Sequence, residues 1–310
     1  MTEQVITSLV PALNPVTFLE LELTNRCQLA CTHCYSGASP TAGHGSMTSE
    51  RWHNVITSAP AAGIETIQLI GGEPTMHPDF LALADHVLGT GLKLQVFTNL
   101  YRVTDALWAL YGRPGVHVAT SYYSDVAAEH DKITRRPGSH ARTRAAIVEA
   151  LERGIPLKVG VVDLGGEGQR ADEAHAEMIA LGVPRVGPVD RVRAVGRATE
   201  HMGKEPDVTE LCGQCGNGRA AISWHGDVRM CVLSRFLPPA GNVRITSLAD
   251  IFASEAWRDL LALVPRHQPR GCNPGSDGND CGPAETLCEG NALILPPIPA
   301  LFFRPDGGAR

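Results

Sequence analysis

The sequence TNRCQLACTHCY (residues 24–35) places Cys27, Cys31 and Cys34 on one short segment with the spacing C-x3-C-x2-C. This segment directly follows residues 17–23, in which apolar and polar residues alternate as in a β-strand. In a fully coordinated [4Fe–4S] cubane, each of the four irons takes one cysteine ligand. Three thiolates on one loop would therefore leave the fourth iron open to a substrate or cofactor, as a catalytic zinc keeps one position open.

The other six cysteines lie far along the chain, and none occurs between residues 35 and 211. They are Cys212, Cys215, Cys231, Cys272, Cys281 and Cys288. Because the total is odd and no secretory signal peptide is visible, we expect a reducing, cytoplasmic location without a disulfide framework. Clustered thiols indicate metal binding. The alternative to an iron–sulfur cluster is structural zinc, for which His33 or His44 would be the fourth ligand at the first segment.

The composition limits the classes of function. The 310 residues carry a net charge of −6, and 43% of them are hydrophobic. Such a chain is long enough to bury a core. The acidic balance argues against a nucleic-acid-binding protein, which usually carries a basic stripe. No apolar run reaches the roughly 18 residues that a membrane-spanning helix needs, so we expect no membrane partner.

Strand and helix patterns alternate through the first two thirds of the chain. The expected strands are residues 17–23, 64–70, 92–98, 116–121, 156–164 and 185–189. The expected helices are residues 49–61, 79–89, 104–111, 142–153 and 171–181. This alternation predicts an α/β fold with a parallel sheet that is either open or closed into a full or partial barrel. The chemistry is then expected at the C-terminal ends of the strands.

The pattern changes after about residue 205, where Gly, Pro, Asn and Cys become frequent and only residues 247–264 look helical. This part indicates a small irregular Cys-rich C-terminal domain that a metal site would help to stabilise. We therefore expect an α/β domain at residues 1–205 and a Cys-rich domain at residues 206–290. Residues 291–310 contain several prolines and are expected to form an irregular tail.

The cysteine spacing resembles that of the radical S-adenosylmethionine (radical SAM) superfamily. The resemblance implies a partial (β/α)6 barrel and a [4Fe–4S] cluster at Cys27, Cys31 and Cys34 whose open iron binds S-adenosylmethionine. Reductive cleavage of this cofactor would give methionine and a 5′-deoxyadenosyl radical that abstracts a hydrogen atom. The residue before the last cysteine is usually aromatic in the family and lies against adenine. His33 occupies that position here.

Two further motifs carry the resemblance. Gly71-Gly72-Glu73-Pro74 resembles the family's turn after the second strand, which meets the amino group of the bound methionine. Glycine allows a close backbone approach there, and backbone carbonyls can accept from an ammonium group. Asn99 ends the third strand as in the family's Thr-Asn-Gly, although Leu100 replaces the glycine. We expect Gly71, Gly72, Glu73 and Asn99 to contact the cofactor.

The later strands add three candidate features. Ser121 ends the fourth strand, where a hydroxyl often binds the cofactor in the family. The resemblance assigns the methionine carboxylate to Arg135, and Arg136 is the neighbouring alternative. Arginines recur over residues 191–197 near the sixth strand. We expect a solvated face there, with a site for a substrate carboxylate or an acidic peptide as the alternative.

The C-terminal cysteines resemble the SPASM and twitch extensions of this superfamily, which carry auxiliary [4Fe–4S] clusters. The pair Cys212 and Cys215 and the G-x4-C motif of Gly226 and Cys231 fit this resemblance. The spacing C-x8-C-x6-C over residues 272–288 departs from the familiar C-x2-C-x5-C-x3-C ending. Six thiolates can fully ligate one cubane but not two. The resemblance therefore implies one or two auxiliary clusters, with an open site or a spare thiol that could donate a hydrogen atom.

The resemblance implies a radical SAM enzyme that cross-links a ribosomally synthesised peptide, forms a thioether in it or epimerises it. The alternatives are a dehydrogenase or epimerase of a sugar, aminocyclitol or amino acid, and a non-catalytic iron–sulfur or zinc redox module. We expect an external electron donor of flavodoxin or ferredoxin type. Because only residues 1–16 precede the first strand, leader-peptide binding would need a separate protein or the barrel mouth. Glu22, Tyr35 and Asp163 lie near strand ends, but no catalytic acid or base is assigned.

Overall fold

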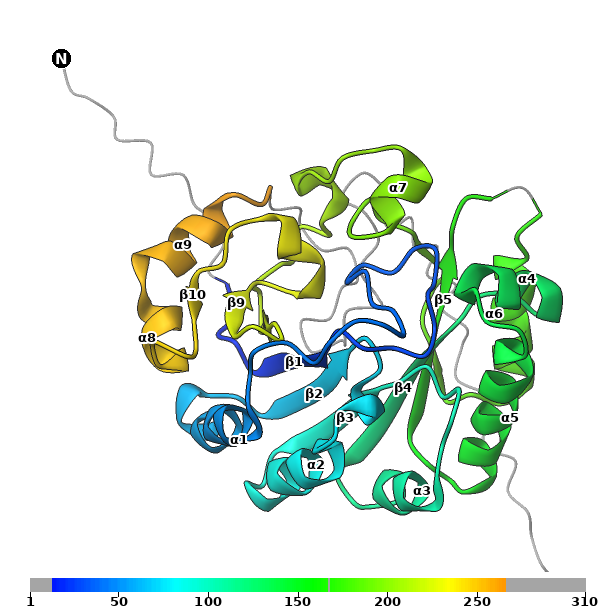
Figure 1. Cartoon of the computed structure of the whole chain (residues 1–310), viewed down its shortest axis with the longest axis horizontal. Helices are drawn as coiled ribbons and strands as arrows, with labels where there is room; N and C mark the ends of the chain where they lie inside the picture. Colours follow the sequence, from blue (N-terminus) through cyan, green and yellow to red (C-terminus); the bar gives the residue numbers. More distant parts are fainter. Residues whose placement is uncertain (1–12, 167, 266–310) are drawn as a thin grey trace, which may run out of the picture.

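The computed structural model describes residues 13–166 and 168–265. Its central feature is a sheet whose first six strands run parallel in chain order (Figure 1). They are β1 (Phe18–Thr24), β2 (Thr66–Gly71), β3 (Lys93–Phe97), β4 (Val116–Tyr122), β5 (Leu157–Asp163) and β6 (Arg185–Val186). A short seventh strand, β7 (Asp190–Arg191), pairs with the end of β5. Within the described residues the sheet does not close, so the predicted partial (β/α)6 barrel is confirmed.

Helices follow the strands and cover one face of the sheet (Figure 1). They are α1 (Ser49–Ser58), α2 (Phe80–Gly89), α3 (Asp105–Tyr111), α4 (Ala127–Thr134), α5 (Ser139–Glu152) and α6 (Ala171–Ala180). Single 3-10 turns, η1 (Pro60–Ala62) and η2 (Pro74–Met76), lie beside α1 and α2. None of the helices in the described part of the chain has the length and apolar character that crossing a bilayer requires.

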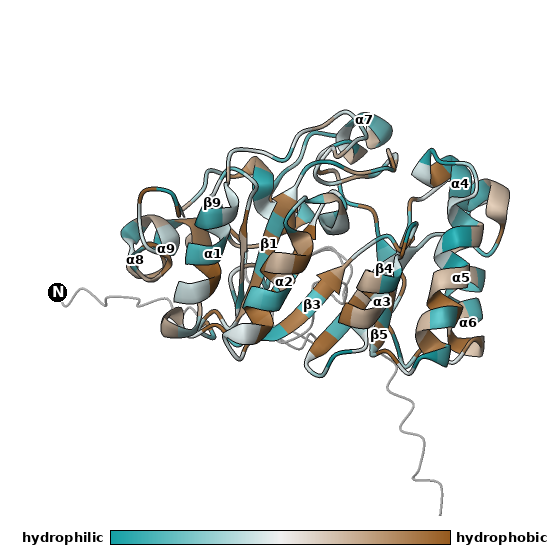
Figure 2. Cartoon of the chain, turned by 60° about the horizontal axis from the view of Figure 1, so that its bottom comes forward, coloured by the Kyte–Doolittle hydropathy of each residue, from teal (hydrophilic) through white to brown (hydrophobic). Residues whose placement is uncertain are grey.

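The first helix shows why these segments fold as they do. Thr48 caps α1 by accepting a hydrogen bond from the amide of Arg51. Trp52, Val55 and Ile56 lie three and four residues apart on one face and are buried against the sheet. The helices of Figure 2 accordingly carry both apolar and polar segments. Truncating Trp52, whose exposed fraction is 0%, would remove about 3–5 kcal/mol of stability.

The chain after residue 205 joins the same sheet instead of folding apart from it. β8 (Arg219–Ile222) pairs in parallel with β1, and β9 (Asp227–Arg229) and β10 (Gly241–Asn242) continue the sheet in antiparallel fashion. β1 therefore has a neighbouring strand on each side, β8 and β2. The sequence pattern did not reveal β8, β9 or β10. The division into domains at residue 205 stays a prediction.

The remaining elements are short. They are α7 (Ala198–Met202), η3 (Val208–Glu210), η4 (Val232–Phe236), α8 (Leu248–Ala253) and α9 (Glu255–Ala262). The helix expected at residues 247–264 is thus two helices, because Ser254 has an extended backbone and caps α9. Helix α4 was not expected, and α5 begins three residues earlier than the predicted start at residue 142.

Candidate active site

A cavity of about 240 Å³ lies where the parallel strands end. Its wall includes the last or next-to-last residues of four strands, namely Gly71, Phe97, Ser121 and Val162. A cavity therefore lies at the C-terminal ends of the strands, where the sequence predicts the site of the chemistry. Thiols of both cysteine groups line it: Cys27, Cys31, Cys34, Cys212, Cys215 and Cys231. Cys272, Cys281 and Cys288 lie outside the described residues.

The cysteine loop, residues 25–39, follows β1. Backbone hydrogen bonds hold it, two to the distant helix α4 and others within the loop itself. The amide of Ala30 donates to the carbonyl of Thr134 at 3.1 Å, and that of Thr32 donates to the carbonyl of Ile133 at 2.9 Å. The amide of Cys27 donates to the carbonyl of Ser39 at 3.0 Å. The C-terminal end of α4, which contains Ile133 and Thr134, thus supports the loop.

Hydrogen-bond donors surround two of the loop sulfurs. Cys27 Sγ accepts from the amide of Leu29 at 3.4 Å and from Asn99 Nδ2 at 3.5 Å. Cys34 Sγ lies 3.4 Å from Ser36 Oγ. Burial raises the pKa of Cys27 to about 12, so the bare thiol is protonated at neutral pH. Metal binding would displace this proton, and N–H donors to sulfur are a feature of iron–sulfur sites. The donor set therefore fits a thiolate-held cluster.

Arg197, the residue before α7, also holds the cysteine loop. Its Nη1 donates to the carbonyl of Cys31, and its Nη2 donates to the carbonyls of Gly37 at 3.0 Å and Ala38 at 2.6 Å. Its own amide donates to the carbonyl of Cys34 at 2.9 Å. One residue thus makes four hydrogen bonds to the cysteine loop. This role was not foreseen from the sequence.

The Gly-Gly turn packs directly on the backbone before Cys27. The amide of Gly72 donates to the carbonyl of Thr24 at 2.7 Å, and that of Glu73 donates to the carbonyl of Arg26 at 2.8 Å. A Cβ on Gly72 would stand 2.4 Å from the carbonyl oxygen of Arg26. Gly71 has a φ of +140°, a conformation that glycine adopts readily. Both glycines line the cavity, and both are needed for the close approach.

Glu73 lies behind the cavity wall. Its carboxylate accepts hydrogen bonds from Thr75, from Thr98 Oγ1 at 2.8 Å and from the amide of Asn99 at 2.9 Å. Burial raises its pKa, against the opposing effect of these hydrogen bonds. The side chain thus ties the end of β2 to the end of β3, and the carboxylate is not part of the cavity lining.

His33, Asn99 and Ser121 line the cavity as their predicted roles require. The ring of His33 meets the edge of Tyr123 with the centroids 4.8 Å apart, and its Nδ1 is buried without a hydrogen-bond partner. Burial lowers the pKa of His33 to about 4, so the imidazole is neutral at pH 7. Leu100, which replaces the glycine of the family's Thr-Asn-Gly motif, has a φ of +54°. Glycine suits this position because it adopts positive φ more readily than other residues.

Neither candidate for the carboxylate-binding arginine lines the cavity. Arg135 is exposed at the end of α4, where it has a φ of +53°. The Nε of Arg136 donates to the hydroxyl of Tyr101 at 3.0 Å. The assignment of Arg135 to the cofactor therefore stays a prediction without geometric support.

The basic run is mostly not a solvated face. Arg191 is exposed, as expected, and lines the cavity. Arg193 is 6% exposed, and its Nη2 lies 3.1 Å from both carboxylate oxygens of Asp190, so the expectation is wrong for this residue. Arg197 is half-buried on the cysteine loop.

The C-terminal thiols approach one another at the same cavity. Cys215 Sγ and Cys231 Sγ lie 3.6 Å apart, and both side chains are buried. Cys231 caps η4, with its amide donating to Ser234 Oγ at 3.2 Å. Within residues 13–265, residue 167 excepted, no three His, Cys, Asp or Glu side chains surround a position for a single metal ion.

Sequence reasoning missed several polar residues of the cavity wall. Glu20 of β1 is paired in register with Gln68 of β2, and both side chains are buried and line the cavity. Arg219 of β8 lies 3.8 Å from Glu20. The signal was present in the sequence, because Glu20 alternates with leucines in β1 and Gln68 interrupts the apolar residues of β2.

Comparisons with known proteins agree with this geometry. Residues 21–179 match the family model of the radical SAM superfamily, and residues 209–281 match SPASM, an iron-sulfur cluster-binding domain. The PqqA peptide cyclase of Methylocella silvestris is 30% identical over 178 residues, which are 57% of this chain and 48% of that protein. The antilisterial bacteriocin subtilosin biosynthesis protein AlbA of Bacillus subtilis is 31% identical over 142 residues, or 45% of this chain and 32% of that protein.

Solved structures show the same fold. The structure of Streptococcus suis SuiB bound to precursor peptide SuiA has a TM-score of 0.64 and 13% identity, and covers 80% of this chain and 66% of that one. The structure titled anSMEcpe with bound AdoMet has a TM-score of 0.61 and 11% identity, with 80% and 83% covered. The chain spans less than half the length of the two curated relatives above. With more than half of its residues matched to one family model and its cysteine loop at the cavity, the chain belongs to the radical SAM superfamily and carries a SPASM iron–sulfur extension.

Proposed function

We propose that this radical SAM enzyme modifies a ribosomally synthesised peptide by abstracting a hydrogen atom, which leads to a cross-link, a thioether or an epimerised residue. When bound, the cluster and S-adenosylmethionine supply the 5′-deoxyadenosyl radical for this step. The observation that carries the proposal is a cavity whose wall contains thiols from both the cysteine loop and the C-terminal part of the chain.

The names of the similar proteins support a peptide substrate. They include a PqqA peptide cyclase, a subtilosin biosynthesis protein and SuiB bound to a precursor peptide. The match of residues 209–281 to the SPASM domain includes five of the six C-terminal cysteines and supports the auxiliary cluster. These relatives favour a peptide over the sugar, aminocyclitol or amino acid that the sequence left open.

We assign the following roles to the chain's own residues. Cys27, Cys31 and Cys34 would hold the cluster that binds S-adenosylmethionine, while Arg197 and the Gly71-Gly72 turn hold their loop in shape. We also propose that His33, which lines the cavity, contacts the cofactor.

The C-terminal thiols Cys212, Cys215 and Cys231, which line the same cavity, would hold an auxiliary cluster. Cys272, Cys281 and Cys288 are proposed to contribute further ligands. We also propose Asn99 and Ser121 as cofactor contacts, with an external ferredoxin- or flavodoxin-type donor and a separate leader-binding protein as partners.

The test is an anaerobic assay of the reconstituted full-length protein with dithionite, S-adenosylmethionine and short peptides encoded by neighbouring genes. We expect 5′-deoxyadenosine and a peptide that has lost hydrogen or changed stereochemistry, both followed by mass spectrometry and chiral amino-acid analysis. Turnover of sugars or free amino acids in place of every peptide would contradict the substrate assignment. If the iron-loaded protein forms no 5′-deoxyadenosine, the enzymatic role is contradicted.

A further inference from the structure

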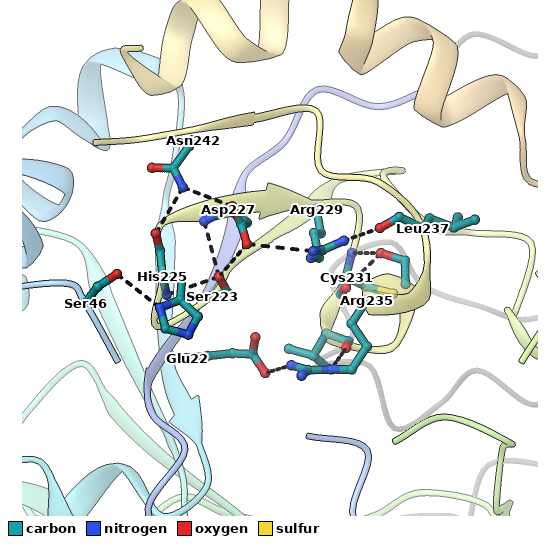
Figure 3. A network of polar contacts seen from close by, with 12 residues as sticks. Glu22, Ser46, Ser223, His225, Asp227, Arg229, Cys231, Arg235, Leu237 and Asn242 are labelled. Carbon is teal, nitrogen blue, oxygen red and sulfur yellow. Dashed lines mark hydrogen bonds and ion pairs between the residues drawn. The ribbon is translucent and has the colours of Figure 1, made fainter. Parts of the chain in front are cut away.

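Arg235 joins strand β1 to the turn after Cys231 through hydrogen bonds (Figure 3). Its Nη2 donates to Glu22 Oε1 at 2.6 Å, and its Nε donates to the carbonyl of Val232 at 3.3 Å. Val232 directly follows Cys231 in the chain. The guanidinium thus contacts the turn that carries one C-terminal thiol.

The same guanidinium also lies against the cysteine loop. Its Cζ is 5.3 Å from the centre of the Tyr35 ring and 5.0 Å from that of the Trp224 ring, both cation–π distances. Tyr35 directly follows Cys34. One cation therefore touches the residue next to a thiol in each of the two groups.

Strand β1 fixes this arrangement. Glu20 Oε2 accepts a hydrogen bond from the amide of Val232 at 3.3 Å, and Glu22 accepts from Arg235. Both glutamates belong to β1, which leads directly into the cysteine loop. The side chains of Glu22 and Arg235 are 2% and 19% exposed, so water screens their charges only weakly.

We propose that Arg235, held in place by Glu22, supplies one positive charge near both iron–sulfur sites and so raises the reduction potential of each. This inference rests on the proposed function, in which both thiol groups hold clusters. A cluster becomes more negative when it is reduced, and a nearby cation stabilises that state in a weakly screened environment. Loss of the charge should make both potentials more negative.

The experiment measures each site separately in the reconstituted full-length protein. A Cys27/Cys31/Cys34→Ala background reports the C-terminal cluster, and a Cys212/Cys215/Cys231→Ala background reports the loop cluster. In each background, EPR-monitored potentiometric titrations compare three variants with the parent: R235Q, R235K and E22Q. A fourth variant, R113Q, is the matched control, since Arg113 is an exposed arginine paired with Asp85.

We expect R235Q to shift both potentials to more negative values, and R235K, which keeps the charge, to stay near the parent. E22Q should shift both potentials to more positive values, because it leaves the cation without its counter-charge. R113Q should shift neither. If R235Q does not fold, E22Q still decides the matter, because it should shift both potentials to more positive values while R235K leaves them near the parent.

A shift of one potential alone, or equal shifts for R235Q and R235K, overturns the inference. Unchanged potentials in E22Q overturn it as well. Iron and sulfide analysis of the unmutated protein separates this failure from a failure of the proposed function. Clusters that load normally and do not respond to Arg235 refute only its effect on the potentials, whereas a protein that takes up no cluster refutes the proposed function itself.

Discussion

The two thiol groups are built in different ways although they share one cavity. The first occupies residues 27–34 and is held from outside by α4, by the Gly-Gly turn and by Arg197. The second is spread over residues 212–231, on the turns around β8 and β9, and it reaches the cavity because β8 pairs with β1. A short motif can thus specify a local ligand set, whereas a dispersed set depends on a strand pairing across about two hundred residues of sequence.

Removing the thiols gives the largest expected difference between the two groups. Cys27/Cys31/Cys34→Ala should reduce 5′-deoxyadenosine formation to background, because no protein ligand of the loop cluster remains. Cys212/Cys215/Cys231→Ala should retain cleavage of S-adenosylmethionine but lose the peptide product. Quantifying both products by liquid chromatography and mass spectrometry checks this. Equal losses of cleavage in both variants would show that the groups do not act separately.

The close approach of the Gly-Gly turn gives the next largest effect. Gly72→Ala forces a Cβ to within 2.4 Å of the carbonyl oxygen of Arg26, so we expect a loss of about 1–3 kcal/mol in the free energy of unfolding. Gly89→Ala is the control, since no atom lies within 4 Å of its Cβ and it ends a helix. Urea unfolding should show Gly89→Ala unchanged or slightly stabilised. Similar losses in both variants would refute the steric argument.

The Arg197 clamp should matter mainly to the first group. Arg197→Met removes the charged donors to three loop carbonyls, with a cost of about 1.5–3 kcal/mol for charge-assisted hydrogen bonds, reduced by partial exposure. The variant should lose iron from the loop faster than the parent when a chelator is added, while the C-terminal iron stays. Arg191→Met, which changes an exposed arginine of the same run, should release iron at the parent rate.

The smallest expected effect concerns the support beneath the loop. The Asp131 carboxylate accepts from the amide of Gly138 at 2.6 Å, from Ser139 Oγ at 2.9 Å and from the amide of His140 at 2.9 Å. Burial opposes ionisation, but these hydrogen bonds outweigh it and lower the pKa of Asp131. A lowered folded-state pKa contributes stability above the unfolded value, about 3.9, which is lost as the pH falls through the folded value.

Asp131→Asn should therefore cost about 1 kcal/mol at neutral pH, similar to the loss of a helix cap. The difference from the parent should disappear at acidic pH, once Asp131 is protonated in both the folded and the unfolded protein. Thermal unfolding at several pH values measures this. A difference that persists at the lowest pH would show that the charge of Asp131 is not responsible.

Most strands of the α/β part were predictable because apolar residues alternate or cluster over a few positions between turn residues, although the strand expected at residues 185–189 is only Arg185–Val186. The expected strand at residues 116–121 appears as Val116–Tyr122, and that at 156–164 as Leu157–Asp163. Helix α4 was missed because its sequence, AAEHDKIT, is short and holds a single large apolar residue, Ile133. It is stabilised by His130, Ile133 and Thr134, which are buried against the neighbouring structure.

The C-terminal strands were missed for a different reason. β8 has only four residues, and its pairing with β1 is not visible from its own sequence. The same limit applies to the site. The spacing of Cys27, Cys31 and Cys34 was sufficient to predict their proximity, whereas the contact of Arg197 with Cys31 spans 166 positions and has no local signature.

This long separation has a consequence for how the protein matures. A ribosome that has just released Cys34 has produced every thiol of the first group, but Arg197 and β8 do not yet exist. Until they emerge, the carbonyls of Cys31, Gly37 and Ala38 lack their clamp, and β1 lacks one of its neighbours. The structural support of the first group is therefore complete only after the chain has been synthesised through the end of β8 at Ile222.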